Sequence, residues 1–413
     1  MIAYREMPSD PLTTATPIVR VITRLNIGGP SIQATRLTSA LDDYGFTTTL
    51  IHGRLGDGEG DMSYLLAPGA RSLYLESLRR PLSPLADLRA LRQLYGALKR
   101  TRPAIVHTHM AKAGMLGRVA AAAYNMTRGG APRARVVHTY HGHVLEGYFS
   151  PLVTGLFITL ERMLARVSDV VVAISPAIER ELRDGFRIGR AAQYRVVPLG
   201  FDLREFAAID DDARADARAR LEVATNAEVV STVGRLTSIK QHRLFLDAVA
   251  AASRTRPRLM ALIAGDGELR DDLEAYARTL GINDRVRFLG WRRDLSVIYG
   301  ATDVFMLTSR NEGTPVALIE AMASGVPGVS TDVGGVKDVI DSADVGARVP
   351  DGDAAGLAAH IVRYMADPDL RRRTGERARA AVHGRYSLDR LVRDIVALYS
   401  ELLDDAKKAA PRH

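Results

Sequence analysis

The stretch 17–30 reads PIVRVITRLNIGGP, a β-rich run that ends in two glycines and a proline, and a helical pattern follows it over 31–44. Further apolar runs form a first block at 46–52, 104–109, 135–140, 170–175 and 195–199, and a second at 228–234, 259–265, 286–289, 304–308, 328–331 and 347–349. Helical segments separate these runs. Strands that alternate with helices build parallel sheets covered on both faces. The sequence therefore predicts an α/β protein with two Rossmann-like, doubly wound domains that face a central cleft.

Domain boundaries follow from these blocks, each of which has the size of one domain. We expect a disordered tail over 1–16, domains over 17–198 and 199–385, an amphipathic helix over 386–403 and a flexible tail over 404–413. The first tail is polar and lacks the apolar core of a signal peptide. The segment 198–202, PLGFD, closes the first block and is the expected hinge.

Composition narrows the classes of protein. The 413 residues include no cysteine, which excludes disulfides, thiolate metal sites and thiol nucleophiles and is compatible with a cytoplasmic protein. No run approaches the ~20 apolar residues that span a bilayer. An association with the inner face of the membrane stays open.

The positive charge is concentrated in the first half of the chain. Residues 1–200 hold 25 Lys and Arg against 15 Asp and Glu, net +10, whereas the rest holds 31 against 33, net −2. A basic domain suits an acidic acceptor, nucleic acid or an anionic membrane surface. In 78–102, leucines alternate with seven basic residues, and we favour a core-facing helix with a solvated basic face over a membrane-binding one. Nucleic acid is disfavoured, because no aromatic-rich RNA-binding signature or zinc finger accompanies the charge.

The segment 311–320, NEGTPVALIE, predicts a helix start that can hold an anion. Thr314 is a good N-cap and Pro315 suits the first helical position, so we expect a helix from Val316 to about Ser324. Its free N–H groups point back toward Gly313 and attract anions such as phosphate.

Two carboxylates flank this helix start. Glu312 lies in the loop before it, and Glu320 lies roughly 9 Å further along, from six residues at about 1.5 Å rise each. Acids this far apart cannot share one proton. They are better placed to grip hydroxyl groups at two points of an elongated ligand, with a phosphate held between them.

A basic loop follows the first strand of the second block. Arg235 and Lys240 come after the run that ends in Gly234, where a strand gives way to a helix. An arginine fork and a lysine point charge together suit a diphosphate, and could stabilise it as a leaving group without a metal. Taken alone, two cations after a strand are more often plain surface charges.

Three glycine-containing turns are less specific. Gly28 and Gly29 would let a backbone approach a phosphate, yet such turns are common in α/β folds. The segment 265–267, GDG, lacks the third glycine of a dinucleotide fingerprint, and we interpret it as a tight turn. The segment 351–353, DGD, is interpreted as a turn and a helix cap rather than a metal site.

Two His-x-His pairs, His107 with His109 and His141 with His143, lie at expected strand ends and could chelate zinc. A catalytic zinc usually needs three protein ligands, and no third ligand with a supporting carboxylate is evident, so no metal is expected. At a cleft edge a histidine serves better as a hydrogen-bond donor to a sugar or an acceptor. His141, in the sequence TYHG, is the strongest candidate.

Together these pieces resemble a retaining glycosyltransferase of family GT4 with the two-domain GT-B fold, over nearly the whole chain from Pro17 to about Leu403. The resemblance rests on the order of GG at 28–29, TYHG at 139–142, VPLGFD at 197–202, VGRL at 233–236 with Lys240, GDG at 265–267, and EGTP at 312–315 through EAMA at 320–323. The carboxylate pair with seven residues between, in this order with the others, is highly specific. No single piece would be.

The resemblance implies a function and a site. A hexose or N-acetylhexosamine would pass from a nucleotide-diphosphate sugar, with UDP as the expected nucleotide, to an acceptor hydroxyl in polysaccharide or glycoconjugate synthesis. The first domain would bind the acceptor, lipid-linked or saccharide, and the second the donor, without cofactor or metal. The final helix would cross back to the first domain.

The implied roles fall on named residues. Arg235 and Lys240 would contact the diphosphate, Glu320 the ribose, and Glu312 with the backbone of Gly313, Thr314, Pro315 and Val316 the transferred sugar. Gly28 and Gly29 would close over the phosphates, and His141 would reach the sugar. With the carboxylates too far apart for a two-carboxylate mechanism, the leaving diphosphate would itself help to deprotonate the acceptor on the same face.

Departures and alternatives remain. Leu199 stands where an asparagine is common, and Thr308 precedes Ser309 where proline is common; neither position is expected to do chemistry. The acceptor side has no motif that can be matched.

Three alternative functions stay open. They are a UDP-sugar epimerase of the same fold, a phosphorylase using pyridoxal phosphate, and a non-catalytic nucleotide-sugar-binding protein.

Overall fold

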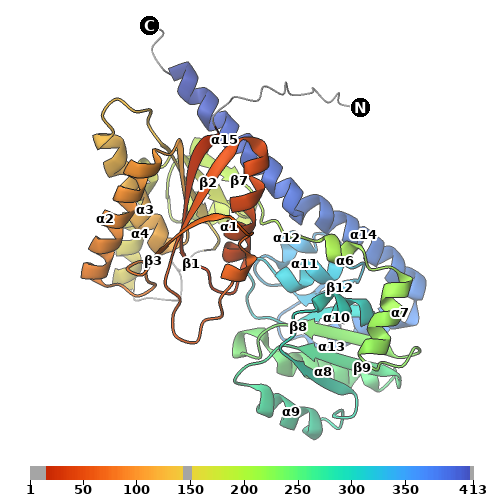
Figure 1. The fold of residues 1–413 in the computed structure, drawn as a ribbon. Coiled ribbons are helices and arrows are strands. Elements are labelled where there is room, and N and C mark those ends of the chain that lie inside the picture. The colour runs from red at the N-terminus through yellow and green to blue at the C-terminus, as the bar shows by residue number, and fades with distance from the viewer. Residues whose placement is uncertain (1–14, 143–150, 410–413) are drawn as a thin grey trace, which may run out of the picture. The chain divides into compact units, whose positions relative to one another are not determined.

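Two separate parallel sheets organise the chain. The structure, a computed structural model, describes residues 15–142 and 151–409 (Figure 1), so the tails expected over 1–14 and 410–413 lie outside it. The chain divides into unit 1, which comprises residues up to Pro198 together with those from Leu391, and unit 2, Leu199–Arg390. Each unit holds one sheet of parallel strands connected by helices, so the predicted α/β fold with two doubly wound domains is confirmed. The predicted cleft stays a prediction, because the positions of the units relative to one another are not determined.

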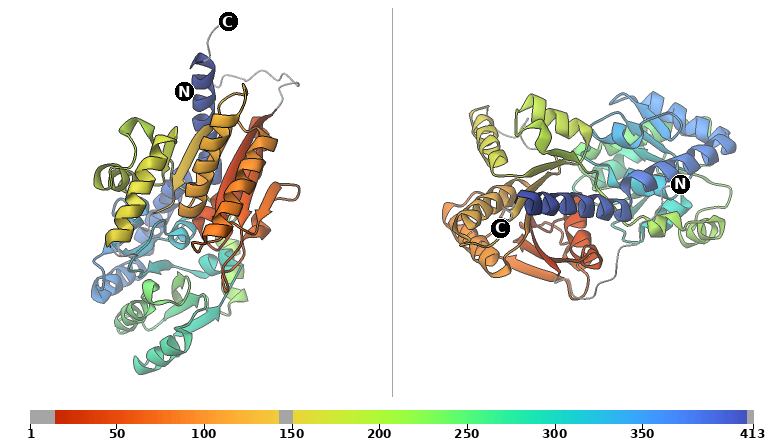
Figure 2. Two further views of the ribbon diagram at one scale, coloured as in Figure 1. Left: turned by 90° about the vertical axis from the view of Figure 1, so that its left-hand side faces the viewer. Right: turned by 90° about the horizontal axis from the view of Figure 1, so that it is seen from above.

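Unit 1 is built on a seven-stranded sheet with helices on both faces (Figures 1 and 2). The strand order is β3-β2-β1-β4-β5-β6-β7. The strands are β1 (Thr16–Arg24), β2 (Phe46–Gly53), β3 (Arg71–Leu75), β4 (Ile105–His109), β5 (Arg135–Tyr140), β6 (Val170–Ala173) and β7 (Tyr194–Val196), and the helices are α1 (Gly29–Ala40), α2 (Pro84–Thr101), α3 (Ala111–Thr127), α4 (Pro151–Arg166), α5 (Pro176–Arg180) and α15 (Leu388–Ala409). Sequence analysis missed β3, because this edge strand buries little apolar surface and carries a weak pattern.

The two faces of this sheet differ in chemistry. Val19, Val21 and Val106 pack with Leu94 of α2 and Ala120 of α3 in one apolar core. The opposite face carries a buried polar layer, in which Arg20 of β1 lies beside His107 of β4. α15 packs on that face, since the Tyr399 hydroxyl lies 2.7 Å from Nδ1 of His107.

Unit 2 is built on a six-stranded sheet of order β10-β9-β8-β11-β12-β13. The strands are β8 (Glu228–Val233), β9 (Leu259–Ala264), β10 (Val286–Gly290), β11 (Val304–Leu307), β12 (Gly328–Thr331) and β13 (Gly346–Val349), and the helices are α6 (Arg204–Ala207), α7 (Asp211–Arg220), α8 (His242–Ser253), α9 (Arg270–Thr279), α10 (Leu295–Ala301), α11 (Val316–Ala323), α12 (Val336–Val339), α13 (Ala354–Ala366) and α14 (Pro368–Tyr386). Its core joins Val230 and Met306 of the central strands to Phe245 of α8 and Ile361 of α13. Asp353 caps α13 by accepting from Gly356 N at 2.8 Å, as predicted for the segment 351–353.

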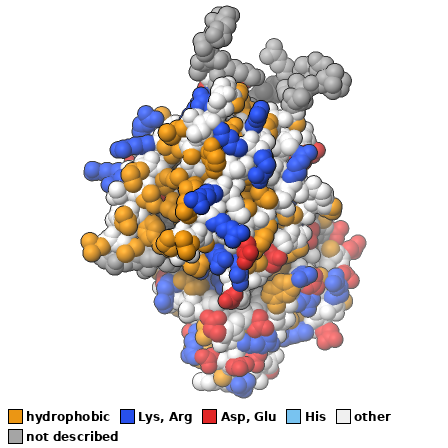
Figure 3. Space-filling model, turned by 60° about the vertical axis from the view of Figure 1, so that its left-hand side comes forward, with side chains coloured by type: hydrophobic (Ala, Val, Ile, Leu, Met, Phe, Trp, Pro, Cys, Tyr) orange, Lys and Arg blue, Asp and Glu red, His pale blue; other side chains and the backbone are white. Residues whose placement is uncertain are grey.

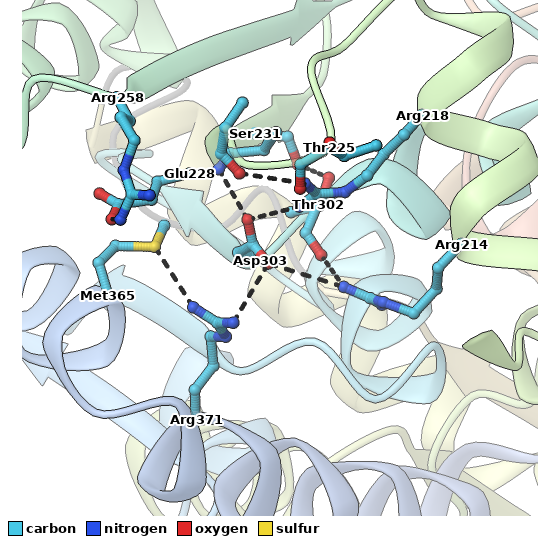
Figure 4. Close-up of polar contacts among 12 residues, drawn as sticks. Arg214, Arg218, Thr225, Glu228, Ser231, Arg258, Thr302, Asp303, Met365 and Arg371 are labelled. Atoms are coloured by element: carbon cyan, nitrogen blue, oxygen red, sulfur yellow. Dashed lines mark hydrogen bonds and ion pairs between the residues drawn. The ribbon is translucent and has the colours of Figure 1, made fainter.

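One buried carboxylate ties two helices to the amino edge of this sheet. Asp303, directly before β11, accepts from Arg218 of α7 at 2.7 Å and from the Val229 N–H of β8 at 2.8 Å (Figure 4). Arg214 of α7 and Arg371 of α14 lie 3.9 and 3.6 Å from its other oxygen. The carboxylate therefore holds α7 and α14 against the starts of β8 and β11.

The C-terminal helix is longer than predicted. α15 runs from Leu388 to Ala409, so residues 404–409 of the expected flexible tail are helical. Alanine and lysine in this segment are strong helix formers, which explains the continuation. Ser387, with ψ 148°, separates α15 from α14.

Candidate functional site

An ion pair joins two loops at the carboxyl edge of the unit 2 sheet. Lys240 ends a short 3-10 turn after β8, and Glu312 follows β11. The Lys240 Nζ atom lies 2.6 Å from Oε1 of Glu312. The Ser309 hydroxyl donates to the same carboxylate oxygen at 2.6 Å. The fold thus brings together two predicted site residues that are 72 positions apart in sequence.

Hydroxyl groups hold both members of this pair in place. The Thr308 hydroxyl donates to the carbonyl oxygen of Lys240 at 3.0 Å, and the Thr331 hydroxyl donates to that of Ser309 at 2.6 Å. Because Thr308, Ser309 and Thr331 are buried, these bonds fix the backbone on which Lys240 and Glu312 stand. Sequence analysis gave the 308–309 position no role; the structure makes it the support of the ion pair.

Two glycines after β12 form a cradle for the loop that carries Glu312. Gly335 N donates to the Glu312 carbonyl oxygen at 2.8 Å. A Cβ on Gly334 would lie 2.1 Å from that oxygen, and one on Gly335 would lie 1.9 Å from the Gly313 oxygen. Only glycine permits this approach. Sequence analysis did not single out Gly334 and Gly335, although two glycines follow a strand here, as they do at 28–29.

A second close approach corrects the interpretation of segment 265–267. Rather than a tight turn, it is a loop that packs its backbone against the loop carrying Arg235: Leu236 N donates to the Asp266 oxygen at 3.0 Å. A Cβ on Gly265 would lie 1.8 Å from the Gly234 oxygen. The two loops after β8 and β9 therefore support each other.

Helix α11 follows the loop that carries Glu312. Its N-cap lies one residue later than predicted. The N-cap residue is Pro315, whose side chain makes no capping hydrogen bond, so the prediction of Thr314 as N-cap is wrong. The helix over 316–323 is confirmed. Without a capping side chain, the first N–H groups of α11 keep their capacity to bind an anion.

Glu320 faces a different environment from Glu312. The Tyr299 hydroxyl of α10 donates to Oε2 of Glu320 at 3.0 Å. Burial is the main reason that the pKa of the Glu320 carboxyl is raised to about 7; the bond from Tyr299 opposes the shift and the nearby Glu205 adds to it. Glu320 is thus poised between its neutral and its ionised form near neutral pH.

The other predicted site residues are Arg235 in unit 2 and Gly28, Gly29 and His141 in unit 1. Arg235 is exposed, and no carboxylate within residues 15–142 and 151–409 forms an ion pair with it, so its guanidinium can take a ligand. Gly28, with φ 151°, precedes Gly29 at the start of α1 in unit 1. Their approach to the unit 2 site, like that of His141, stays a prediction.

The described members of the two His-x-His pairs, His107, His109 and His141, belong to a network of buried polar groups in unit 1. His107 bonds Tyr399 and Thr139, and His109 lies between Arg20 at 2.9 Å and His141 at 3.0 Å. His143 lies outside the described residues. In the part of the chain that the structure describes, no group of three His, Cys, Asp or Glu side chains is arranged to hold a metal ion.

The two parallel sheets and their connections are those of the GT-B fold. A glycosyltransferase from Rickettsia africae has a TM-score of 0.77 at 20% identity, covering 95% of this chain and 99% of that one. HepE from Anabaena, solved in complex with UDP, has a TM-score of 0.77 at 21% identity, over 94% of this chain and all of that one. These likenesses show the fold.

Sequence comparison adds the family. The family described as Glycosyltransferase Family 4 matches residues 27–205, and that described as Glycosyl transferases group 1 matches residues 213–381. The UDP-Gal:alpha-D-GlcNAc-diphosphoundecaprenol alpha-1,3-galactosyltransferase of Escherichia coli is 30% identical over 75% of this chain and 79% of that one. The lipopolysaccharide core biosynthesis glycosyltransferase LpsE of Rhizobium meliloti is 32% identical over 54% and 61%. The chain belongs to glycosyltransferase family GT4, and the predicted resemblance is confirmed.

Proposed function

We propose that this glycosyltransferase is a retaining, metal-independent enzyme that transfers a hexose or N-acetylhexosamine from a UDP-sugar to a hydroxyl of a lipid-linked saccharide in cell-envelope glycoconjugate synthesis. The observation that carries the proposal is the supported Lys240–Glu312 pair beside the open helix start of α11. The names of relatives that act on a diphosphoundecaprenol-linked sugar or on lipopolysaccharide support the acceptor class. The UDP complexes of HepE support the donor class.

Each donor group finds a partner of suitable chemistry in this arrangement. The diphosphate takes the Arg235 guanidinium and the Lys240 ammonium, which are charge-assisted donors. The sugar hydroxyls take Glu312 and the backbone of Gly313 to Val316, and the ribose hydroxyls take Glu320. From unit 1, Gly28 and Gly29 would approach the phosphates, and His141 would donate to the transferred sugar.

The transfer breaks the bond between the anomeric carbon and the β-phosphate oxygen and forms one from that carbon to the acceptor oxygen. The acceptor proton passes to the departing phosphate, so UDP leaves and no protein group changes its charge. Lys240 stabilises the negative charge that develops on the diphosphate, and such preorganised charge is worth several kcal/mol in a water-poor site. Entry of the acceptor on the face that the diphosphate leaves retains the anomeric configuration.

A donor-binding experiment tests this proposal. Purified full-length enzyme is screened for thermal protection by UDP, GDP and their sugars in EDTA, because a ligand at 100 times its Kd stabilises the native state by about 2.7 kcal/mol. We expect protection by UDP and a UDP-sugar, and its loss in Lys240→Met. Protection by no nucleotide sugar, or protection that needs a divalent ion, contradicts the proposal.

A lipid-linked acceptor requires the enzyme to reach a membrane surface, and unit 1 carries a face that fits one. No helix within the described residues is long and apolar enough to span a bilayer. On the side of unit 1 formed by α2, α3 and α4, exposed apolar side chains gather among basic ones (Figure 3). We call this the apolar-basic face. Its exposed apolar members include Leu82, Leu85, Leu88, Leu152 and Leu156.

The first turns of α2 show the pattern most clearly. Leu85 is 85% exposed, whereas Ala90, Leu94 and Leu98 further along the helix are buried, so the helix packs on the core from Ala90 onward. The exposed arginines Arg80, Arg89 and Arg92 flank the exposed leucines of this segment, which are Leu82, Leu85 and Leu88. Inserting a leucine contributes about 1.5–3 kcal/mol, and each arginine adds about 1 kcal/mol near an anionic leaflet. A few such residues suffice for reversible binding.

Vesicle sedimentation tests this face. We expect the enzyme to sediment with vesicles that contain anionic phospholipid and to stay in solution with neutral ones or at high salt. Leu82→Ser with Leu85→Ser abolishes sedimentation, whereas Trp291→Ser, which removes an exposed aromatic of unit 2, leaves it intact. Equal binding by both variants contradicts this assignment of the face.

A further inference from the structure

A buried arginine in unit 1 has no carboxylate partner among residues 15–142 and 151–409. Arg20 of β1 is fully buried. Its Nη1 atom donates to the Ala34 carbonyl oxygen at 3.2 Å, and its Nη2 atom lies 2.9 Å from Nε2 of His109. A guanidinium held only by neutral acceptors is costly to bury. Packing alone therefore does not explain a cation at this position.

Strand register connects Arg20 to a predicted site residue. His109 of β4 lies opposite Ile22 of β1 and opposite Thr139 of β5, and all three point to the polar face of the sheet. His141, two residues after Thr139, continues that face. Nδ1 of His109 lies 3.0 Å from Nε2 of His141. Arg20, His109 and His141 thus form one hydrogen-bonded chain.

The protons in this chain are determined by its first member. A guanidinium donates and never accepts, so Nε2 of His109 must accept from Arg20. Neutral His109 then carries its proton on Nδ1 and donates it to Nε2 of His141. Since Nε2 of His141 accepts, the proton of His141 is on Nδ1. We propose that Arg20 is a positioning residue that acts through His109 to hold His141 as a neutral imidazole whose Nδ1–H is its free donor.

The surroundings reinforce the neutral state. Burial, followed by the charge of Arg20, lowers the pKa of His141 to about 3. The pKa of His109 is also held well below its usual range by burial and by the neighbouring His107 and Arg20. His141 is therefore neutral near neutral pH, which suits a hydrogen-bond donor.

The free donor needs an acceptor. Nδ1 of His141 is shielded from bulk water and has no hydrogen-bond partner among the described residues. A buried donor without a partner costs about 1–3 kcal/mol, which a ligand oxygen would recover. Given the proposed function, on which this step rests, that oxygen belongs to the transferred sugar.

Histidine tautomers can be measured directly in the full-length enzyme. With 15N-labelled histidine, long-range 15N–1H correlation reports the tautomer of each of the 10 histidines, and His109→Gln and His141→Gln variants assign two of them. We expect Nδ1–H for both His109 and His141, without titration between about pH 5 and 8. An Nε2–H or a titrating imidazolium at His141 overturns the proposal.

Two substitutions of Arg20 separate positioning from stability. Lysine, like arginine, only donates, so Arg20→Lys should keep the tautomers, whereas Arg20→Met should release them. We expect Arg20→Met to lose on the order of 100-fold in kcat with an unchanged donor KM, and Arg20→Lys to recover most of it. Equal losses in both variants, with the His141 tautomer unchanged, overturn the proposal.

The wild-type tautomers decide the proposal even where Arg20→Met does not fold. They also separate it from the proposed function. If no nucleotide sugar is turned over, yet His141 shows Nδ1–H and shifts to Nε2–H in Arg20→Met, the positioning by Arg20 stands and the proposed function fails. If UDP-sugar is turned over but His141 shows Nε2–H, the proposed function stands and the positioning by Arg20 fails.

Discussion

The Lys240 ammonium lies 2.6 Å from the Glu312 carboxylate, and both rest on backbone that buried hydroxyls hold. In the absence of a ligand each residue neutralises the other. A diphosphate sugar offers a separate partner to each, a phosphate to Lys240 and hydroxyls to Glu312. Under the proposed function, the ion pair is a donor site whose two charges are already in position, so little reorganisation is needed on binding.

Removing either charge should impair catalysis more than stability. We expect Glu312→Gln and Lys240→Met each to lower kcat/KM on the order of 100-fold, because a preorganised charge is lost. The double variant should be no worse than about the poorer single one, since the two residues act as a unit. Steady-state kinetics with UDP release checks both. Asp344→Asn, which breaks an exposed ion pair with Arg377, is the matched control and should leave kcat/KM unchanged.

The raised pKa of Glu320 makes stability depend on pH with a definite sign. A carboxyl that titrates near 7 in the folded state and near 4.5 in the unfolded state binds more protons when folded, so stability falls as pH rises through this window. Glu320→Gln removes that loss. Thermal unfolding should show the variant to be more stable than wild type at pH 8, by about 3 kcal/mol, with the difference disappearing toward pH 4.5. A constant difference across this range contradicts the assignment.

The affinity for the donor should depend on whether Glu320 is ionised. An ionised Glu320 accepts more strongly from ribose hydroxyls than a protonated one, by about 1 kcal/mol, so the affinity for UDP should rise about fivefold between pH 6 and 8. Calorimetric titration checks this in wild type. In Glu320→Gln the affinity should be lower and independent of pH over this range; a pH dependence that survives the substitution excludes Glu320 as its source.

The glycine cradle predicts a sharp contrast between two glycine substitutions. Gly335→Ala places a Cβ 1.9 Å from the Gly313 oxygen, so the loop that carries Glu312 must shift, and we expect a loss of kcat/KM of more than about tenfold. Gly384→Ala is the control, because it lies in α14 with nothing within 4 Å of the new Cβ. It should keep full activity and gain up to about 1 kcal/mol in stability.

Asp303, at the amino edge of the unit 2 sheet, should affect stability and not catalysis. Asp303→Asn leaves Arg214, Arg218 and Arg371 without their shared partner, and breaking such a buried cluster costs about 3–5 kcal/mol. Chemical denaturation measures this loss. The folded fraction of the variant should retain the kcat of wild type, because Asp303 lies at the opposite edge of the sheet from Lys240 and Glu312. A fall in kcat without a fall in stability would contradict this expectation.

The sequence predicted the alternation of strands and helices well, because buried parallel strands such as β8 and β11 read as continuous apolar runs. It failed at β3, a half-exposed edge strand, and at the start of α11, where proline rather than threonine precedes the helix. The ion pair of Lys240 with Glu312 could not be predicted from the sequence, because contacts between loops far apart in sequence depend on strand order. The Gly334 and Gly335 cradle and the Arg20 chain were likewise visible only once the register placed their neighbours.

Stereochemistry of the product tests the central claim most directly. Full-length enzyme is incubated in EDTA with a UDP-sugar of α configuration and a diphosphopolyprenol-linked N-acetylglucosamine in anionic vesicles, and the new linkage is read by NMR. Retaining transfer from a donor held by Lys240 and Glu312 predicts an α-linked product, one UDP per product, and no reaction without acceptor. A β-linked product, a requirement for a divalent metal, or release of UDP with a free epimerised sugar would contradict it.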